Sequence, residues 1–456
     1  MGQEKAGRSF LTLETQNPKP ETLTMNFSET LAYLYSLGHE TLAMKLGLES
    51  IVALCQALGN PQLKYRVVHI AGTNGKGSTA AMTEAIALRA GHRVGLYTSP
   101  HLVEITERIR IHGKDITQAD FARLATQVRR ASEQLVEQKT LPASPTYFEQ
   151  VTAIGLLCFA EQNVDLAILE VGLGGRLDAT NICQPTVCAI TPVSLDHQEY
   201  LGNQLATIAA EKAGILKPEI PVVVAPQAPE AWNAIITRAN EIKAPTISVA
   251  EFQAMIDEAS TGMFHFQYHT GLADYTVQLN LRGGHQVINA CTAIHIAEQL
   301  RQHGLCIPKT SIEEGLQNVN WAGRLEMIEV QGRQLLLDGA HNLAGAKTLQ
   351  DFLRAYESNL PITMIFGVMN DKAIAGMAEM LFPFAQLIIA THINNPRSAD
   401  PVVIVDAATQ LGKPSRRTES VAAALQEALQ HTPANGLICV CGSLYLIGEV
   451  KQLLTK

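Results

Sequence analysis

A lysine at the end of a glycine-rich turn is the clearest candidate for chemistry in this chain. The apolar residues 67–71 lead into Gly72-Thr73-Asn74-Gly75-Lys76, and a helical pattern begins at Gly77. The backbone N–H groups of such a turn and the N-terminus of the helix attract phosphate, and the Lys76 ammonium adds a full charge. The general Walker pattern is matched only in part, because Ile70 and Gly77 hold the places of its first Gly and its Ser or Thr. The turn predicts a phosphate-binding loop, with an ordinary strand-to-helix turn as the alternative.

A carboxylate at the end of a second apolar stretch is suited to hold a metal ion. Residues 166–169 are apolar and lead to Glu170, and the glycine-rich loop that follows presents Arg176 and Asp178. A strand-end carboxylate beside a phosphate loop is a usual means of holding Mg²⁺ on a nucleotide. A glycine-rich hairpin would explain the glycines but not the position of Glu170.

Three further polar residues follow apolar stretches or interrupt them. Ser99 comes after an expected strand and could bind a hard cation, or it could cap a turn. His197 follows Ser194-Leu195-Asp196 and could be a ligand or a structural histidine. Lys212 lies among Ala, Gly and Ile, where a lysine either shifts its pKa or extends along the surface to water.

Polar residues in the second half of the chain could complete a nucleotide site. Asn289 opens an amphipathic helix and could bind an adenine edge. Arg324 lies in an expected linker and Asp338 ends an expected strand, so both could reach phosphate and ribose across a cleft. Arg324 could equally form a salt bridge that docks one domain on the other.

Short apolar strands alternate with amphipathic helices, which predicts an α/β fold with a mostly parallel sheet. The expected strands of the first half are 66–71, 93–97, 165–171, 186–191 and 221–225. The expected helices there are 78–90, 117–138, 147–161, 205–214 and 285–303. Residues 260–282 alternate like antiparallel strands. In a second α/β unit, strands are expected at 335–338, 362–367, 386–391 and 437–441, with helices near 342–357, 371–381 and 421–430.

The composition excludes several other classes of protein. The 456 residues carry a net charge of −8, with 46% hydrophobic and 5% aromatic residues, which argues against a nucleic-acid partner and against disorder. No apolar run reaches the ~18–20 residues of a membrane span. The eight cysteines form no CxxC pair, so we expect buried, reduced thiols and a cytoplasmic protein.

Taken in order, these segments resemble the folylpolyglutamate synthase/dihydrofolate synthase family of the Mur ligase superfamily. The segments that carry the resemblance are 69–78, 170–181 (EVGLGGRLDATN), 195–197, 211–215, 323–324, 338–342 and 367–372. The resemblance implies a Mur-ligase-like fold, with an N-terminal P-loop-type ATPase domain and a smaller, Rossmann-like C-terminal domain. It divides the chain into an N-terminal extension (1–26), an ATP-binding central domain (27–318) and a C-terminal glutamate-ligase domain (319–456).

The resemblance also implies an ATP-dependent amide ligase. A carboxylate attacks the γ-phosphate of ATP to give an acyl phosphate, and the amine of L-glutamate then displaces phosphate. The acid is dihydropteroate, a tetrahydrofolate polyglutamate, or both in a bifunctional enzyme. The implied cofactors are Mg²⁺ at two sites and a monovalent cation, with ATP as co-substrate. The implied partners are small molecules only, with no nucleic acid or membrane, and the protein is expected to be a monomer.

Matching the family's motifs assigns roles to individual residues. The catalytic residues are Lys76, Lys212 and His341; the ATP-binding residues are Thr73, Asn74, Gly75, Lys76, Gly77, Ser78, Asn289, Arg324 and Asp338; the substrate-binding residues are Thr146, Phe148, Leu177, Asp178 and Ala179; and the metal ligands are Ser99, Glu170, His197 and Lys212, the last as a carbamate.

Three alternatives stay open at this point. The first is a monofunctional folylpolyglutamate synthase, because the shared motifs do not separate the two activities. The second is a Mur-type ligase that acts on a UDP-sugar, although only about 65 residues precede the phosphate loop, too few for a typical additional domain. The third is an ATP-gated binding module, which would have no need for a paired metal site.

Overall fold

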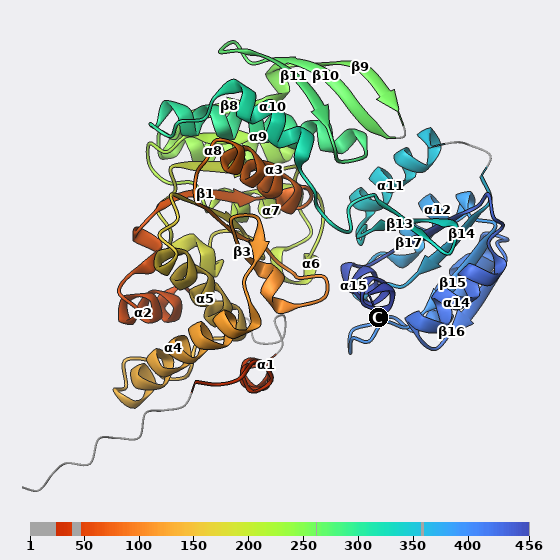
Figure 1. The fold of residues 1–456 in the computed structure, drawn as a ribbon, viewed down its shortest axis with the longest axis horizontal. Coiled ribbons are helices and arrows are strands. Elements are labelled where there is room, and N and C mark those ends of the chain that lie inside the picture. Colours follow the sequence, from red (N-terminus) through yellow and green to blue (C-terminus); the bar gives the residue numbers. More distant parts are fainter. Residues whose placement is uncertain (1–23, 39–46, 261, 357–359, 456) are drawn as a thin grey trace, which may run out of the picture.

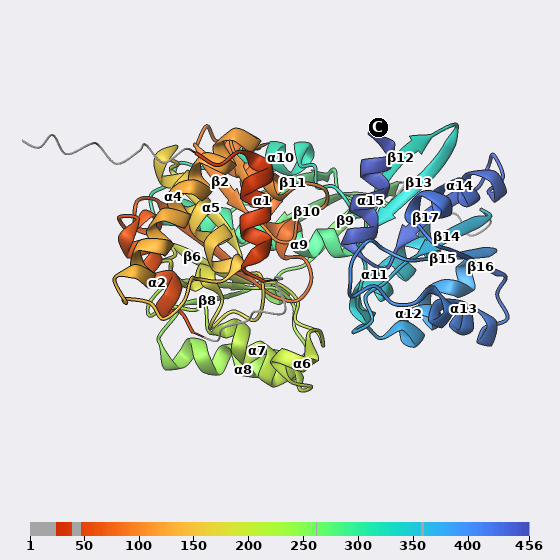
Figure 2. The same ribbon diagram turned by 90° about the horizontal axis from the view of Figure 1, so that it is seen from below.

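The computed structural model describes residues 24–38, 47–260, 262–356 and 360–455. Two α/β units lie side by side, the larger one formed by the N-terminal part of the chain and the smaller one by the C-terminal part (Figure 1 and Figure 2). The predicted N-terminal extension falls outside the described residues except for 24–26. The predicted domain boundary falls at the end of α10 (Lys309–Asn318).

An eight-stranded, mostly parallel sheet forms the centre of the larger unit, as the sequence predicts. Its strands lie in the order β4 (Lys114–Asp115), β3 (Ile109–Ile111), β2 (Val94–Tyr97), β5 (Leu166–Glu170), β1 (Arg66–Ala71), β6 (Val187–Ile190), β7 (Val222–Val224) and β8 (Thr246–Ser248). Among the strands of this sheet only β3, near one edge, runs opposite to the others, so it pairs antiparallel with both β2 and β4. Because β1 lies between β5 and β6, the carboxyl ends of these three strands are neighbours.

Helices cover both faces of this sheet, because its central strands are buried on both sides. Val68 and Ile70 of β1 face one core, and Val67 faces the other, as the alternation along a strand requires. The first face carries α3 (Lys76–Arg89), α9 (Gly284–Gln302) and α10, and a sheet of β11 (Asp274–Leu279), β10 (Met263–His269) and β9 (Ala254–Ser260) covers them. The second face carries α1 (Phe27–Ser36), α2 (Glu49–Ala57), α4 (Gln118–Glu137), α5 (Tyr147–Glu161), α7 (Leu205–Ala213) and α8 (Pro229–Glu241).

A six-stranded sheet forms the centre of the smaller unit. Its order is β12 (Glu326–Val330), β13 (Arg333–Asp338), β17 (Leu437–Cys441), β14 (Ile362–Phe366), β15 (Leu387–Thr391) and β16 (Ser415–Thr418), and only β12 is antiparallel. One face carries α11 (Leu343–Ala355), α12 (Ile374–Leu381) and α13 (Pro401–Gln410), and the other carries α14 (Val421–His431) and α15 (Leu444–Leu454).

The expected bounds agree with these elements to within a few residues, but the sequence interpretation missed several other elements. The missed elements include β9, β12, β16, α13 and α15. Seven of the eight cysteines are buried thiols, as expected, whereas Cys306 is exposed. None of the described helices is both long enough and apolar enough to span a membrane.

Candidate active site

The carboxyl ends of β1, β5 and β6 open into a cavity that the smaller unit closes from the opposite side. The structure brings most of the predicted site residues together here. The predicted residues that line the cavity are Thr73, Asn74, Gly75, Lys76, Gly77, Ser78, Ser99, Glu170, His197, Lys212, Arg324, Asp338 and His341. The other predicted residues lie behind this lining, and their positions are described below.

The predicted phosphate loop joins β1 to α3 with its lysine at the first helical position. Gly75 precedes Lys76 as the N-cap with a φ of 86°, a left-handed conformation that glycine adopts most easily. A side chain at Gly72 would also meet the Oγ1 atom of Thr191 at 1.9 Å, so the backbone comes close there only because no side chain is present. The Lys76 Nζ atom folds back and donates to the carbonyl oxygens of Gly72 and Thr73, both at 3.1 Å.

Asn289 lies directly behind this loop. A Cβ atom at Gly75 would lie 2.4 Å from the Asn289 Oδ1 atom, so the two residues are packed together. The Asn289 Nδ2 atom donates to Gln286 Oε1 at 2.9 Å, and Gln286 Nε2 donates to Ser78 Oγ at 3.3 Å. This buried network ties α9 to the start of α3, and sequence reasoning missed the part that Gln286 plays in it.

Glu170 ends β5 beside Lys76, as the sequence predicts. Its carboxylate accepts a hydrogen bond from the Ser99 backbone N–H at 3.2 Å. Burial raises the pKa of Glu170, and the nearby Lys76 charge works in the opposite direction. Ser99 does not cap the short helix that follows, Ile105–Arg108, because Glu104 is its N-cap.

His197 and Lys212 both face the cavity as poorly hydrated nitrogen bases. Burial lowers the pKa of His197 to about 4, which leaves a neutral imidazole at neutral pH. Lys212 is only 5% exposed, so the alternative of a lysine that extends along the surface is wrong. Burial, helped by the Lys76 charge, lowers the pKa of Lys212 from its ordinary 10.5 to about 7.

The glycine-rich loop 172–181 is fastened to the last turn of α7, which carries Lys212. The Arg176 N–H donates to the Glu211 carbonyl oxygen at 2.8 Å, and its guanidinium pairs with the Glu211 carboxylate at 2.9 Å. A Cβ atom at Gly175 would lie 2.7 Å from the same carbonyl oxygen. The close contact holds the Lys212 backbone against the loop.

The hydrogen-bond acceptor positions of the Asp178 carboxylate are occupied by donors from its own loop. One oxygen accepts from the N–H groups of Gly172 and Leu173 at 3.0 and 2.9 Å. The other accepts from the N–H and hydroxyl of Thr180 at 3.0 and 2.6 Å. Two oxygens offer about four acceptor positions, so a substrate can bind this carboxylate only by replacing one of these donors. Leu177 and Ala179, its predicted substrate-binding neighbours, also lie outside the cavity lining.

The other predicted substrate-binding residues have clear structural roles. Thr146 caps α5 and exchanges hydrogen bonds with Glu149 in a capping box. The Phe148 ring packs on Gly172, where a Cβ atom would lie 2.5 Å from the ring edge. An aromatic ring therefore lies beside the loop next to the cavity, which suits a flat heterocyclic ligand.

Asp338 ends β13 and orders the linker from the larger unit. Its carboxylate accepts from the N–H groups of Leu325 and Ala340 at 2.9 and 3.0 Å. Burial raises the pKa of Asp338, and the neighbouring Arg324 charge opposes this shift. Arg324 lies over Gly339, where a Cβ atom would meet its guanidinium at 2.3 Å, and both residues line the cavity.

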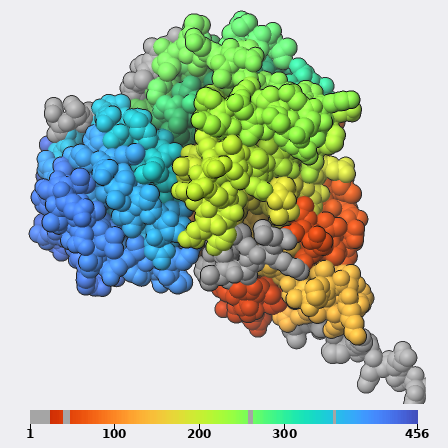
Figure 3. All heavy atoms as spheres, turned by 180° about the vertical axis from the view of Figure 1, so that it is seen from behind, coloured from red at the N-terminus to blue at the C-terminus, as the bar shows by residue number. Residues whose placement is uncertain are grey.

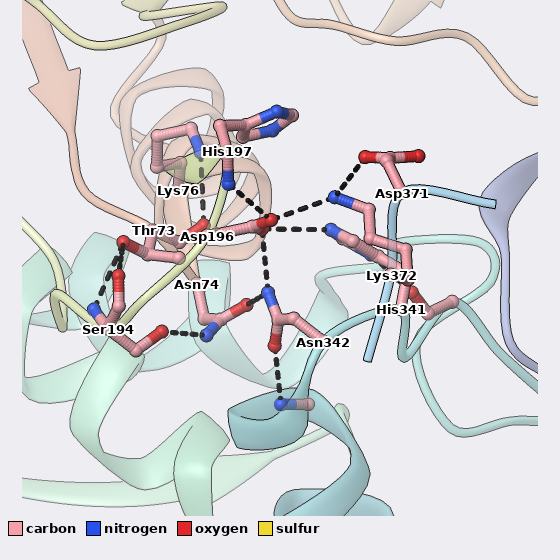
Figure 4. Close-up of polar contacts among 12 residues, drawn as sticks. Thr73, Asn74, Lys76, Ser194, Asp196, His197, His341, Asn342, Asp371 and Lys372 are labelled. Atoms are coloured by element: carbon pink, nitrogen blue, oxygen red, sulfur yellow. Dashed lines mark hydrogen bonds and ion pairs between the residues drawn. The ribbon is translucent and has the colours of Figure 1, made fainter. Parts of the chain in front are cut away.

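Asp196 is an important residue that the predicted site set left out. It contacts Asn342, Lys372 and His341 from the smaller unit (Figure 4). Its place directly before His197 was the only sequence signal, because nothing in the spacing shows that these distant segments meet.

The donors at the predicted metal site suit a hard cation only if the nucleotide contributes further ligands. Across the described ranges, no cluster of three or more His, Cys, Asp and Glu side chains is arranged to hold a metal ion. The predicted set contains two such residues, Glu170 and His197, with Ser99 and Lys212 beside the same cavity. Mg²⁺ commonly binds one or two carboxylates and completes its shell with water and substrate phosphates, so this set fits it.

Comparison with known protein families covers both units. The family model for the Mur ligase middle domain matches residues 70–297, and that for the Mur ligase glutamate ligase domain matches residues 323–444. The chain belongs to the Mur ligase family. Within it, this Mur ligase is 34% identical over 422 residues to the dihydrofolate synthase/folylpolyglutamate synthase of Bacillus subtilis, a match that covers 91% of the chain and 97% of the relative.

Solved structures agree with this assignment. The chain superimposes on Escherichia coli FolC in complex with DHPP and ADP with a TM-score of 0.84 and 30% identity, covering 94% of this chain and 98% of the other. A bifunctional folylpolyglutamate synthase/dihydrofolate synthase with Mn, AMPPNP and L-glutamate bound gives a TM-score of 0.81 and 31% identity, covering 95% and 99%. The predicted family and fold are therefore confirmed, and the cavity of this Mur ligase lies between the two matched regions.

Proposed function

We propose that this Mur ligase uses ATP to join L-glutamate to dihydropteroate and to tetrahydrofolate polyglutamates. The observation that carries the proposal is the convergence of a phosphate loop, a strand-end carboxylate and the linker arginine on one cavity between the two units. The relatives support the substrates, since the matched B. subtilis protein is named for both activities and the matched structures are named for complexes with DHPP, ADP, AMPPNP and L-glutamate. These names favour a folate substrate over a UDP-sugar.

The ATP phosphates would lie on the loop from Thr73 to Ser78. In this position the Lys76 ammonium exchanges its contacts with the Gly72 and Thr73 carbonyls for the β- and γ-phosphates. Arg324 and Asp338 reach the same cavity from the other unit and would hold the remainder of the nucleotide. Asn289 would act from behind Gly75, or contact the base after a change of side-chain position.

Ser99, Glu170, His197 and Lys212 are the residues that would hold Mg²⁺, whose chemistry is to neutralise the phosphate charge. Lys212 suits the carbamate role because an amine with a pKa of about 7 is partly unprotonated at neutral pH, and the neutral amine can attack CO₂. The nitrogen–carbon bond forms, the electron pair of one C=O π bond moves to its oxygen, and the nitrogen gives up one proton, so the neutral amine becomes a carbamate anion with oxygens that can bind a metal ion. Several properties stay predictions from the sequence: two Mg²⁺ sites, a monovalent cation, a monomeric state, a cytoplasmic location and the three domain ranges.

Phosphoryl transfer needs positioning and charge neutralisation more than covalent help from the protein. The substrate carboxylate attacks the γ-phosphorus and ADP leaves. The glutamate amine then attacks the acyl carbon, phosphate leaves, and the nitrogen gives up a proton. His341 lines the cavity opposite Lys76 and would contact the acyl phosphate or the incoming glutamate. The smaller unit excludes water that would otherwise hydrolyse the acyl phosphate.

A product assay tests the proposal directly. The enzyme is incubated with ATP, Mg²⁺ and L-glutamate, once with dihydropteroate and once with tetrahydrofolate, and the products are separated by mass. We expect one added glutamate per ATP consumed with either acid, and none with Lys76→Ala. If product forms with tetrahydrofolate but not with dihydropteroate, the enzyme is a monofunctional folylpolyglutamate synthase. ATP hydrolysis that does not respond to either acid would refute the proposal.

A further inference from the structure

Asp196 lies where the two units meet and accepts hydrogen bonds from both. Its Oδ1 atom accepts from Lys372 Nζ at 2.8 Å and from the His197 N–H at 2.9 Å. Its Oδ2 atom accepts from Asn342 Nδ2 at 2.8 Å, and His341 Nε2 lies 3.5 Å away. Figure 4 shows these side chains pointing from the smaller unit toward the one carboxylate. None of the roles predicted for the site residues explains why these side chains gather around Asp196.

The contact is nearly closed to water, so it is stronger than a surface ion pair. The side chains of Asp196 and Lys372 are 7% and 10% exposed. Burial alone would raise the pKa of Asp196, but His341, His197 and Lys372 together hold it well below its usual value. Separation of the units would exchange these hydrogen bonds for contacts with water, whereas removal of one partner in the closed arrangement would leave the other charge buried and unpaired, which is strongly unfavourable.

The same contact extends to the phosphate loop. Asn342 Nδ2 also donates to Asn74 Oδ1 at 3.2 Å, and Asn74 Nδ2 donates to Ser194 Oγ at 3.1 Å. Thr73 and Ser194 exchange two further hydrogen bonds at 3.0 and 3.1 Å. The Asn342 side chain also caps α11 by accepting from the Gly345 N–H at 2.8 Å, so its orientation is set within the smaller unit. The position of α11 is thereby linked to the loop that receives ATP.

We propose that Asp196 is a positioning residue that holds the smaller unit closed over the phosphate loop through Lys372 and Asn342. Its carboxylate acts as a fixed anion in the larger unit, and the cation and amide of the other unit dock on it. The space-filling view agrees with such a closed arrangement, with the C-terminal part pressed against the segment around residue 200 (Figure 3). The effect on turnover rests on the proposed function, whereas the effect on closure does not.

Asp371 offers a matched control on the far side of the same lysine. Its carboxylate lies 3.4 Å from Lys372 Nζ but belongs to the smaller unit. Removal of its charge changes the surroundings of Lys372 and leaves the contact between the units in place. Loss of closure should therefore follow Asp196→Asn and Lys372→Met, and not Asp371→Asn.

Small-angle X-ray scattering measures closure without any turnover. We expect wild type and Asp371→Asn, with AMPPNP and Mg²⁺, to match the profile calculated from the closed structure, and Asp196→Asn and Lys372→Met to give a larger radius of gyration. The double reversal Asp196→Lys/Lys372→Asp should recover a more compact profile than either single reversal. Circular dichroism and a single folded peak on size exclusion show that each variant has folded.

Kinetics supply the second readout. Loss of a charge-assisted hydrogen bond predicts a fall of roughly 10- to 100-fold in kcat/KM for glutamate in Asp196→Asn. An extended wild type under all conditions, or variants as compact as wild type, would overturn the proposal even if the enzyme makes folate products. A variant that opens in a protein that forms no folate product would leave the closure role intact and refute only the proposed function.

Discussion

Replacement of Lys212 by methionine should make the protein more stable. The ordinary pKa of a lysine is 10.5, and burial lowers that of Lys212 to about 7. The unfolded chain therefore binds a proton that the folded chain releases, and the free energy of unfolding rises with pH between these two values. Each unit of pKa shift corresponds to about 1.4 kcal/mol, so the lysine destabilises the fold by up to ~4 kcal/mol near pH 7.5 and ~5 kcal/mol at lower pH.

Methionine has a similar length and no charge, so Lys212→Met should recover most of this free energy. Urea unfolding in metal-free buffer without CO₂ measures the gain, because a carbamate or a metal ion would remove the unpaired ammonium. The difference between variant and wild type should be largest below about pH 7 and should disappear above about pH 10.5. Activity should be lost at the same time.

Lys217 provides the matched control, since it lies a few residues further along the same segment. Its Nζ atom donates to the carbonyl oxygen and the side chain of Asn181 at 3.1 and 2.8 Å. Lys217→Met therefore loses two hydrogen bonds and should destabilise the protein by ~1–2 kcal/mol. A Lys212→Met protein that is no more stable than wild type, or whose advantage does not change with pH, would refute the reasoning about Lys212.

Four other changes test separate parts of the structure. Lys76→Ala should lower kcat by about 100-fold or more with an unchanged melting curve, which steady-state kinetics and calorimetry can check. Gly175→Ala should destabilise the protein by ~1–3 kcal/mol in urea unfolding, because its Cβ atom would lie 2.7 Å from a carbonyl oxygen. Burial raises the pKa of Glu84 from 4.5 to about 7, so wild-type stability should fall as pH rises through this range, and a Glu84→Gln variant should lose that slope. Trp321 in the linker packs near Gly77 of the phosphate loop, and Trp232 is the other tryptophan of the chain. In a Trp232→Phe variant, nucleotide binding should therefore change the fluorescence of Trp321, and an unaltered spectrum at saturation would contradict this.

Local patterns in the sequence predicted the elements with strong periodicity or clear ends. The strand over 66–71, the glycine turn and the helix after it follow from a short apolar run that stops at glycines and from the lysine at the helix start. The edge strand β16 (Ser415–Thr418) was missed because its residues, Ser-Arg-Arg-Thr, show no apolar pattern. Such a strand forms because a neighbouring strand supplies its hydrogen-bond partners, a feature of the fold and not of the segment.

The candidate site shows the same division. Glu170 could be recognised because a carboxylate at the end of an apolar strand has few structural explanations. Asp196, Asn342 and Lys372 could not be grouped, because their contact depends on how two separately folded units are placed. The hydrogen bonds of Asp178 were also invisible in the sequence, since its four donors come mainly from the backbone of its own loop.

The filled carboxylate of Asp178 has a consequence for how a heterocycle is chosen. A heterocycle that binds the Asp178 carboxylate must donate an N–H or O–H, because each backbone N–H that it displaces leaves a carboxylate lone pair without a hydrogen bond. Such an exchange replaces one polar contact by another and adds little to affinity, so under the proposed function the affinity would come from contact between the flat face of the heterocycle and Phe148. A ring of the same shape whose edge carries only hydrogen-bond acceptors would not bind to this carboxylate.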